Sequence, residues 1–423
     1  MTRNGLADWL ARLEKFSPDE IVLGLERVHE VLDRLDITYP RHVFHVAGTN
    51  GKGSSVALTQ ALLQSAGQRV GAYTSPHILH YNERINVDGE PATDAEIIAA
   101  FERVEAVRGD VPLTYFEYGT IAAMLVFEKA RVDTAVLEIG MGGRLDAVNA
   151  IEPDAGLITS IGLDHCEWLG DTLEDIGREK AGIMRRGKPI VFASEEVPAS
   201  VVEHADEISA DLRLAGRDYR WSSAKDGWEW RGRSTTLADL EFPALRAPIQ
   251  LQNAAGVLAL IEAAGFGDIL DRDRVNATLA SVSIPGRMQT VKTDREWLLD
   301  VAHNPAAAAA LARALQAMPP RGRTVAILGM LDDKDVEGLV TALGDVVDKW
   351  IAVTANSPRA IPVDELARRV ANRANQGCLE AGSMTAALEE ARRFTSSDDR
   401  IVVTGSFFVV GPALEALGLY SPR

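Results

Sequence analysis

The sequence predicts an α/β protein of two domains, each built on a mainly parallel sheet. Its 423 residues exceed what one ordinary hydrophobic core accommodates. Its composition, 46% hydrophobic and 25% charged, is that of a globular protein. Short β-branched runs alternate with helical stretches along the chain, which is typical of a parallel sheet with crossover helices.

The N-terminal half contains the first set of elements. The segment MTRNGLADWLARLEKF predicts an amphipathic helix and lacks the apolar stretch of a signal peptide. A polar, Trp-rich stretch after about residue 215, RDYRWSSAKDGWEWRGRSTTLADLEF, predicts small antiparallel strands. APIQLQNAAGVLALIEAAG then predicts a loop that enters a helix. The strands expected in the first sheet are HVFHVAG, RVGAYTS, TAVLEIG, AGLITSI and PIVFAS.

A second α/β set follows the segment SIPGRMQTV, in which Pro285 and Gly286 mark the best candidate for a hinge. We expect an N-terminal domain over residues 1–284, a C-terminal domain over 288–423 and a hinge at about 284–290. The strands expected in the second sheet are EWLLDVA, TVAILGM, WIAVTA and RIVVTGS.

Charge and cysteine content narrow the class of protein. The 44 basic and 61 acidic residues give a net charge of -17, which disfavours nonspecific binding to nucleic acid. No apolar run reaches the length of about eighteen residues that a membrane span needs. Cys166 and Cys378 are the two cysteines, which excludes a disulfide framework or a four-cysteine zinc site. This usage suits a reducing cytoplasm.

The stretch HVAGTNGKGSS, residues 45–55, has the features of a phosphate-binding loop. A buried strand, a glycine-rich turn, Lys52, hydroxyls and a helix together aim backbone N–H groups and the helix dipole at a phosphate. The register departs from the common pattern, because Val46 replaces the first glycine and Gly53 separates Lys52 from Ser54. The alternative is an ordinary strand–helix turn with a surface lysine.

Glu138 ends an apolar strand in TAVLEIGMGGRLDAVNAI. Nucleotide-hydrolysing folds place a magnesium-sensing carboxylate at such a strand end. Glycines at positions 140, 142 and 143 allow a close approach of the backbone. A solvated carboxylate without a function is the alternative.

Asp164 and His165 follow another apolar strand in ITSIGLDHCEWLG. They should therefore lie at the same carboxyl edge of the sheet as Glu138, where α/β proteins bind ligands. His165 suits a metal ligand, although a single histidine also serves as a structural residue. Lys180, in the charged segment IGREKAGIMRRGKPIV, is equally compatible with a solvated helix position.

The segment EWLLDVAHNPAAAAALARAL predicts a strand–helix loop in the second domain. Asp300 ends the strand, and Pro305 takes the favoured first position of an alanine-rich helix. His303 and Asn304 thus lie on a loop at the top of the second sheet. They are either active-site residues or parts of a tight capping turn.

Nine motifs in this order resemble those of the folylpolyglutamate synthase/dihydrofolate synthase family of the bacterial bifunctional type, which is related to Mur-type ligases. The resemblance covers nearly the whole chain, from IVLGLERV at 21–28 to VTGSFFVV at 403–410. It implies a P-loop-type ATPase domain that binds the pterin or folate, and a smaller Rossmann-like domain on the glutamate side. The motifs are AGTNGKGS, TSPH, YFEYGT, LEIGMGGRLDAVN, TSIGLDH, GREKAGI, PGR, DVAHNP and LGMLDDKD.

The resemblance implies an ATP-dependent ligase that forms an amide bond. The carboxylate of dihydropteroate or of a reduced folate attacks ATP to give an acyl phosphate, and L-glutamate then displaces phosphate. The implied cofactor is Mg²⁺, with a monovalent cation beside it. The implied enzyme is a cytoplasmic monomer that needs neither nucleic acid nor a membrane.

Residue roles follow from the same motifs. Lys180 matches the lysine that is carbamylated in this family, and such a lysine needs a depressed pKa because only the neutral amine reacts with carbon dioxide. The expected catalytic residues are Lys52, Glu138, His165, Lys180 and His303. The expected ATP-binding residues are Thr49, Asn50, Gly51, Lys52, Gly53, Ser54, Asn253, Arg287 and Asp300. The expected metal ligands are Ser75, Glu138 and His165.

The pterin side is expected to use four segments of the first domain. Two departures from relatives affect the glutamate side instead: Ala306 and Phe408 stand where relatives carry histidine. The expected pterin- and folate-binding residues are Leu23, Gly24, Ser75, Pro76, His77, Arg84, Thr114, Tyr115, Phe116, Glu117, Leu145, Asp146 and Ala147.

Three alternatives stay open. The chain could be a folylpolyglutamate synthase without the second activity. A Mur-type ligase should carry a uridine-nucleotide domain before the phosphate loop, where only about 45 residues precede it. A nucleotide switch without ligase chemistry would need neither the DVAHNP loop nor the pterin-side motifs, and no guanine-reading NKxD occurs.

Overall fold

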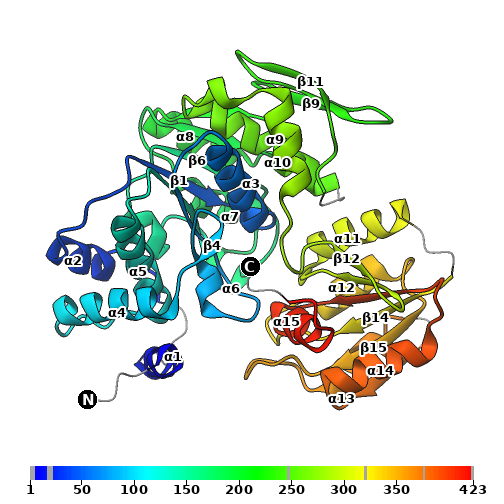
Figure 1. Ribbon diagram of the computed structural model, residues 1–423. Coiled ribbons are helices and arrows are strands. Elements are labelled where there is room, and N and C mark those ends of the chain that lie inside the picture. The colour runs from blue at the N-terminus through cyan, green and yellow to red at the C-terminus, as the bar shows by residue number, and fades with distance from the viewer. Residues whose placement is uncertain (1–4, 17–21, 245–247, 319–321, 375–376, 421–423) are drawn as a thin grey trace. The chain divides into compact units, whose positions relative to one another are not determined.

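The computed structural model describes residues 5–16, 22–244, 248–318, 322–374 and 377–420, which form two compact units (Figure 1). Unit 1 comprises the chain up to Phe242 together with Gln252–Ser281. Unit 2 comprises Pro243–Leu251 and the chain from Val282 onward. The predicted hinge at about 284–290 stays a prediction.

The main sheet of unit 1 has eight strands among the described residues, in the order β4-β3-β2-β5-β1-β6-β7-β8. The run from β2 to β8 is parallel, and β3 and β4 pair antiparallel at one edge. The carboxyl ends of β2, β5, β1 and β6 therefore meet at one edge. The strands are β1 His42–Ala47, β2 Val70–Tyr73, β3 Ile85–Val87, β4 Glu90–Pro91, β5 Thr134–Glu138, β6 Ala155–Ile158, β7 Pro189–Phe192 and β8 Asp211–Leu214.

Helices cover this sheet, and its central strands are therefore buried along nearly their whole length. Helix α3 packs on β1, β2 and β5 and against α10, while α5 packs on β2 and β3 (Figure 1). The helices of unit 1 are α1 Leu6–Phe16, α2 Glu26–Arg34, α3 Lys52–Ser65, α4 Asp94–Arg108, α5 Tyr115–Ala130, α6 Cys166–Leu169, α7 Leu173–Ala181, α8 Ala199–Ile208, α9 Pro248–Ala263 (divided between the units) and α10 Arg272–Ser281, with short 3-10 helices η1 Tyr81–Arg84, η2 Ala147–Ala150 and η3 Gly267–Ile269.

A small antiparallel sheet, green in Figure 1, comprises β9 Arg220–Ser223, β10 Trp228–Arg231 and β11 Thr236–Leu240. Trp228 and Trp230 are buried on β10, and Glu229 and Arg231, which alternate with them, are exposed. The Nε1–H of Trp230 donates to the carbonyl of Ala255 in α9 at 3.1 Å. The prediction of small antiparallel strands is confirmed.

Unit 2 is a smaller α/β unit whose sheet has six strands within the described ranges, in the order β12-β13-β17-β14-β15-β16. Its pairs are parallel except β12 with β13. The predicted α/β class, with a large mainly parallel sheet and a smaller C-terminal α/β part, is confirmed. The elements are β12 Gln289–Lys292, β13 Glu296–Leu299, α11 Pro305–Ala317, β14 Thr324–Leu328, α12 Val336–Leu343, β15 Lys349–Val353, α13 Val363–Ala371, β16 Cys378–Ala381, α14 Met384–Phe394, β17 Arg400–Thr404 and α15 Phe407–Ala416.

Over the described parts of the chain, no helix is both long and apolar enough to span a bilayer.

Candidate active site

The loop between β1 and α3 depends on two glycines. Gly48 has a φ of +144°, and a Cβ atom there would lie 1.9 Å from the Oγ1 of Thr159. Gly51 has a φ of +91°, and its Cβ would lie 2.6 Å from the Nδ2 of Asn253. Only glycine fits both positions. The loop thereby brings Asn253, a predicted ATP-binding residue on α9, directly against Gly51.

The loop after β6 holds the phosphate loop in place. The N–H of Thr49 donates to the carbonyl of Ser160 at 2.8 Å. The Oγ1 of Thr49 donates to the carbonyl of Gly162 at 3.1 Å and accepts from its N–H at 3.0 Å. The Oγ1 of Thr159 donates to the carbonyl of Asn50 at 2.7 Å. Residues 159–162 thus support the site, and the sequence analysis assigned them no role although the motif TSIGLDH contains them.

Two lysines converge on one carbonyl of this loop. The Nζ of Lys52 donates to the carbonyl of Gly48 at 3.0 Å, and the Nζ of Lys180 donates to the same oxygen at 3.1 Å. Lys180 is only 4% exposed, so the solvated-helix alternative is wrong for this residue. Burial, followed by the positive charge of Lys52, lowers the pKa of Lys180 to about 7, while Asp164 and Asp146 oppose the shift.

Glu138 ends β5 and is 4% exposed, beside the start of α3. Its Oε2 accepts from the N–H of Ser75 at 3.3 Å. The same oxygen would lie 3.5 Å from a Cβ atom on Gly53. The structure therefore brings the carboxylate, the Ser75 backbone after β2 and the phosphate loop together, and the solvated-carboxylate alternative does not hold.

His165 lies beyond β6, at the N-terminus of α6, with a left-handed φ of 52°. Its N–H donates to Asp164 Oδ1 at 3.0 Å, and its Nε2 lies 4.0 Å from that oxygen. The side chain of His165 is 35% exposed. His165 thus lies in the segment that follows the carboxyl end of β6, the strand next to β1 in the sheet.

The predicted metal ligands are one hydroxyl, one carboxylate and one imidazole. Across the described residues, no group of three or more His, Cys, Asp and Glu side chains is gathered as a metal cage. Mg²⁺ at phosphate sites usually binds one or two carboxylates and completes its shell with phosphate and water. Glu138 and the adjacent Ser75 fit that donor pattern.

Asp146 closes the loop that follows Glu138. It is 4% exposed, and its two carboxylate oxygens accept from the N–H groups of Met141 at 2.8 Å and Val148 at 3.0 Å. Burial raises the pKa of Asp146 to about 6, against the opposing effects of these backbone donors and of Lys52. The carboxyl group fixes the loop, and its negative charge interacts with Lys52 and Lys180.

An aromatic and basic cluster lies next to the Ser75 segment, where the peptide bond from Ser75 to Pro76 is cis. The Nε–H of Arg84 donates to the Nδ1 of His77 at 2.9 Å. The guanidinium of Arg84 lies 5.5 Å from the ring centre of Tyr81 and 5.4 Å from that of Tyr115. Burial, and then the charge of Arg84, lowers the pKa of His77 to about 4. The cluster thus combines the ring faces of Tyr81 and Tyr115 with the guanidinium cation of Arg84.

The other predicted pterin residues lie on three further segments of unit 1. Phe116 packs on Tyr73 with ring centres 5.9 Å apart, and leaves no room for a Cβ atom on Gly140. The N–H of Gly24 donates to the carbonyl of Leu145 at 3.2 Å. Buried members of the predicted set are Gly24, Thr114, Glu117, Asp146 and Ala147, and half-buried members are Leu23, Ser75, His77, Arg84, Tyr115, Phe116 and Leu145.

Unit 2 holds the remaining predicted site residues. The carboxylate of Asp300 accepts from the N–H groups of Met288 and Ala302, both at 2.9 Å, and burial raises its pKa. The Nδ1 of His303 lies 2.9 Å from the carbonyl of Val301. Because a carbonyl only accepts, this nitrogen carries the proton.

Phe407, at the start of α15, links two of these residues. The guanidinium of Arg287 lies 5.2 Å from its ring centre, and the His303 ring lies 6.3 Å away. Asn304 caps α11 by accepting from the N–H of Ala307 at 2.9 Å. The loop is therefore a capping turn that also groups Arg287 with His303.

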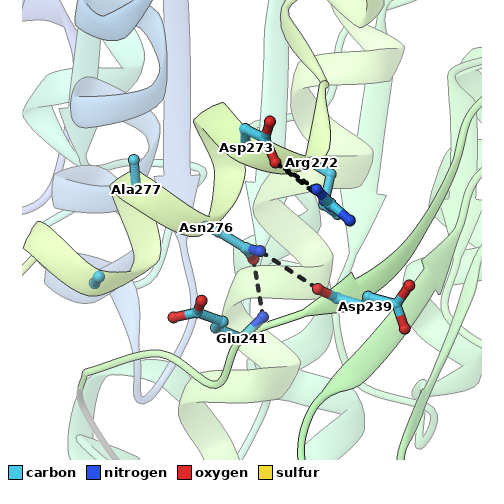
Figure 2. Close-up of a pocket in the computed structure, with 7 residues that line it drawn as sticks. Asp239, Glu241, Arg272, Asp273, Asn276 and Ala277 are labelled. Carbon is cyan, nitrogen blue, oxygen red and sulfur yellow. Dashed lines mark hydrogen bonds and ion pairs between the residues drawn. The ribbon is translucent and has the colours of Figure 1, made fainter.

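Two hollows lie away from these residues. Figure 2 shows one of about 530 Å³ between β11 and α10, in which Asn276 bonds to Asp239 and Glu241, and Arg272 pairs with Asp273. The other, of about 420 Å³, contains Lys349 and Cys378 in unit 2. None of the predicted site residues lines either hollow.

Two family models match the chain. Residues 46–218 match the Mur ligase middle domain, and residues 286–407 match the glutamate ligase domain of Mur ligases. The first match contains the phosphate loop and the residues around Glu138 and Lys180. The second contains Arg287, Asp300 and His303.

Similar proteins share almost the full length of the chain. A protein of Escherichia coli (strain K12) named dihydrofolate synthase/folylpolyglutamate synthase is 39% identical over 413 residues, which cover 97% of this chain and 95% of the relative. The solved structure of E. coli FolC in complex with DHPP and ADP superposes with a TM-score of 0.91 at 38% identity and covers 98% of both chains. A bifunctional folylpolyglutamate synthase/dihydrofolate synthase with Mn, AMPPNP and L-glutamate bound superposes with a TM-score of 0.90 at 39% identity, also over 98% of both chains.

Proposed function

The chain belongs to the dihydrofolate synthase/folylpolyglutamate synthase family, and we propose that it joins L-glutamate to dihydropteroate and to reduced folates at the expense of ATP. The observation that carries this proposal is the meeting of Lys52, Lys180 and Glu138 around one glycine-rich loop. The aromatic and basic cluster of Arg84 and Tyr115 begins directly after the Ser75 segment that contacts Glu138. The residues proposed to bind phosphate and those proposed to bind the pterin thus lie close together at one edge of the sheet.

The reaction has two steps. A carboxylate oxygen of the pterin substrate attacks the γ-phosphorus of ATP, the bond to the bridging oxygen breaks, and ADP leaves. The α-amino group of glutamate then attacks the acyl carbon, loses a proton and expels inorganic phosphate. The protein must align the anions, stabilise phosphoryl charge and exclude water from the acyl phosphate.

The residues of the phosphate loop perform the first of these tasks, the alignment of the anions. Backbone N–H groups from Gly51 to Ser54 lie at the start of α3, where the helix dipole favours a phosphate. The Nζ of Lys52 donates to the carbonyls of Gly48 at 3.0 Å and Thr49 at 3.4 Å, which holds the ammonium at the loop where it is proposed to bind a phosphate oxygen. Asn253, packed on Gly51, is the candidate for the base of ATP.

Mg²⁺ bound to ATP would neutralise phosphoryl oxygens and orient the γ-phosphate. Glu138, the hydroxyl of Ser75 and His165 are the residues proposed to hold it, with a monovalent cation nearby. A divalent cation accompanies the ATP analogue in the solved relative that contains Mn and AMPPNP. The buried Glu138 carboxylate supplies the negative charge that such a cation requires.

Lys180 is proposed to be carbamylated. Its neutral amine would attack carbon dioxide, form an N–C bond and release a proton, which replaces a cation with a carboxylate. The pKa of about 7 makes the neutral amine abundant at physiological pH. The carbamate would also end the repulsion between Lys180 and Lys52.

The glutamate side is assigned to unit 2. Arg287, held over Phe407, is proposed to bind phosphate, and Asp300 the ribose. His303 presents its Nε2 as an acceptor when neutral, because the Nδ1 proton is directed at the carbonyl of Val301. His303 is proposed to lie where the incoming glutamate binds.

The cellular setting is also a proposal. Cys166 and Cys378 are both free thiols, which suits the reducing cytoplasm. The net charge of -17 disfavours nucleic acid as a partner. We propose a monomer, as the resemblance to the family implies.

Phosphate release tests the proposed function. Purified protein should release phosphate only when ATP, Mg²⁺, dihydropteroate and L-glutamate are all present. Replacing dihydropteroate with a reduced folate tests the second activity. Turnover with both substrates supports the bifunctional assignment, because a folylpolyglutamate synthase alone would use the reduced folate but not dihydropteroate. Phosphate release that ignores both the pterin and glutamate would refute the ligase assignment.

A further inference from the structure

A bidentate ion pair links α2 to the N-terminus of α5. The Nε of Arg27 donates to Glu117 Oε1 at 3.0 Å and to Oε2 at 3.2 Å, and its Nη2 donates to Oε1 at 2.7 Å. The side chain of Glu117 is 3% exposed and that of Arg27 is 21% exposed. The pair is therefore largely shielded from water and joins residues 90 positions apart.

The carboxylate of Glu117 is fully engaged by the protein. Besides Arg27, its Oε2 accepts from the N–H of Thr114 at 2.7 Å, and its own N–H donates to the Oγ1 of Thr114 at 3.2 Å. This reciprocal arrangement is a capping box that fixes the first turn of α5. A substrate would have to displace one of these donors to bind the Glu117 carboxylate.

The same arginine fixes a second predicted pterin segment. Its Nη2 also donates to the carbonyl of Val22 at 2.9 Å, immediately before Leu23 and Gly24. The N–H of Gly24 in turn donates to the carbonyl of Leu145 at 3.2 Å. Arg27 is thus bonded to Glu117 in the turn at Thr114–Glu117 and to Val22, which directly precedes the Leu23–Gly24 segment. Gly24 in turn connects that segment to the loop at Leu145.

We propose that Arg27 is a positioning residue for the pterin substrate, which holds the Leu23–Gly24 segment, the start of α5 and the Leu145 loop in one fixed arrangement. This inference rests on the proposed function, because it concerns the pterin side of that site. Arg27 acts through Glu117 and the Val22 carbonyl, and Glu117 contributes through its position rather than through a contact with the substrate.

The chemistry of the pair requires arginine. A planar guanidinium can bind both carboxylate oxygens and still donate to a backbone carbonyl, whereas an ammonium binds as a point charge. Removing the guanidinium leaves a buried carboxylate without its partner, which favours repacking of the segment. Half-buried Tyr115 and Phe116 directly follow Thr114, so such repacking moves the aromatic surface offered to the pterin.

The test compares Arg27→Gln and Arg27→Lys with a matched control. Arg103→Gln removes an arginine that pairs with Glu128 at 2.6 Å, near the opposite end of α5 and away from all three segments. In Arg27→Gln, the KM for dihydropteroate should rise about tenfold, while kcat and the KM for ATP change less than about twofold. Arg27→Lys should recover part of the effect, and Arg103→Gln should leave all three constants unchanged.

A double-mutant cycle with Glu117→Gln separates positioning from contact. Because both residues act through one pair, the KM of the double variant should exceed that of Arg27→Gln by less than about twofold. Equal rises in every KM, additive effects of the two changes or an unchanged dihydropteroate KM would overturn the inference. Thermal unfolding checks that each variant folds. If Arg27→Gln does not fold, Arg27→Lys is compared with Arg103→Gln in its place. Failure of the wild-type protein to ligate dihydropteroate would instead refute the proposed function.

Discussion

Two side chains, Lys52 and Lys180, determine the electrostatics of the site because both donate to the carbonyl of Gly48. Two ammonium groups on one oxygen repel each other, and burial adds to the cost of charging Lys180. The pKa of Lys180 falls to about 7 as a result. The predicted carbamate resolves this conflict by making one partner negative.

Lys180→Ala tests the role of this lysine. The variant should lose activity by about a hundredfold or more, since a charged group near the transferring phosphoryl group is removed. Acetate or formate should restore part of the activity by replacing the carbamate. The control is Lys188→Ala, which removes a half-exposed lysine paired with Asp154 at 2.9 Å and should remain active. Full activity of Lys180→Ala would refute the carbamate.

The reaction with carbon dioxide should depend on pH in a defined direction. The neutral fraction of Lys180 increases as pH rises through about 7. Enzyme stripped of carbon dioxide should therefore regain activity faster at pH 8 than at pH 6, at about equal dissolved carbon dioxide. Reactivation at one rate across this range would contradict the assigned pKa.

Asp146 predicts a dependence of stability on pH. Its folded pKa of about 6 lies above the ordinary 3.8, so the native state binds more protons than the unfolded state between these values. The contribution of Asp146 to the unfolding free energy is therefore largest at low pH and falls as pH rises. Urea unfolding of wild type and Asp146→Asn should show the wild type losing on the order of 3 kcal/mol relative to the variant from about pH 4 to about pH 7. A constant difference would contradict the raised pKa.

At the scale of elements, the phosphate loop works because neighbouring strands support it. The loop after β6 binds the backbone of Thr49 and Asn50, and α9 packs Asn253 on Gly51. The glycine pattern in the sequence therefore reflects close contacts as well as room for a phosphate.

Gly51→Ala tests this support. A Cβ atom would lie 2.6 Å from the Asn253 side chain at a φ of +91°, so the loop must shift and ATP binding should weaken by about a hundredfold. Gly67→Ala is the matched control, because its φ is also positive, +82°, but nothing lies within 4 Å of the added atom. It should cost about 1 kcal/mol of stability and leave ATP affinity unchanged. Calorimetric titration measures the ATP affinity of each variant, and equal affinities in the two variants would contradict the packing argument.

Hydrophobic patterning was enough to predict the central strands and the edge at which Glu138 and His165 lie. Strands β8, β12 and β16 were missed because they are short and only partly buried, which leaves a weak apolar signal. Thr159, Ser160 and Arg27 were not assigned roles for a different reason. These contacts join residues 90 to 110 positions apart, and local sequence carries no information about such pairs.

At the scale of the whole molecule, the predicted site residues divide between two compact units. Unit 1 contains the phosphate loop, the predicted metal ligands and the pterin segments, whereas unit 2 contains Arg287, Asp300 and His303. The matches to the Mur ligase middle and glutamate ligase domains fall on the same two parts of the chain. The proposed ATP-binding residues are thus divided between the two units, whereas the pterin segments lie in unit 1 and His303, proposed for the glutamate side, lies in unit 2.

The central claim is that ATP activates the substrate carboxylate as an acyl phosphate. Dihydropteroate labelled with oxygen-18 in its carboxylate, incubated with the enzyme, ATP, Mg²⁺ and L-glutamate, tests it most directly by mass spectrometry of the released phosphate. An acyl phosphate requires one labelled oxygen in the released phosphate for each amide bond formed, because the attacking oxygen leaves with phosphorus. Unlabelled phosphate released together with the amide product would contradict the acyl phosphate and the mechanism built on Lys52, Lys180 and Glu138.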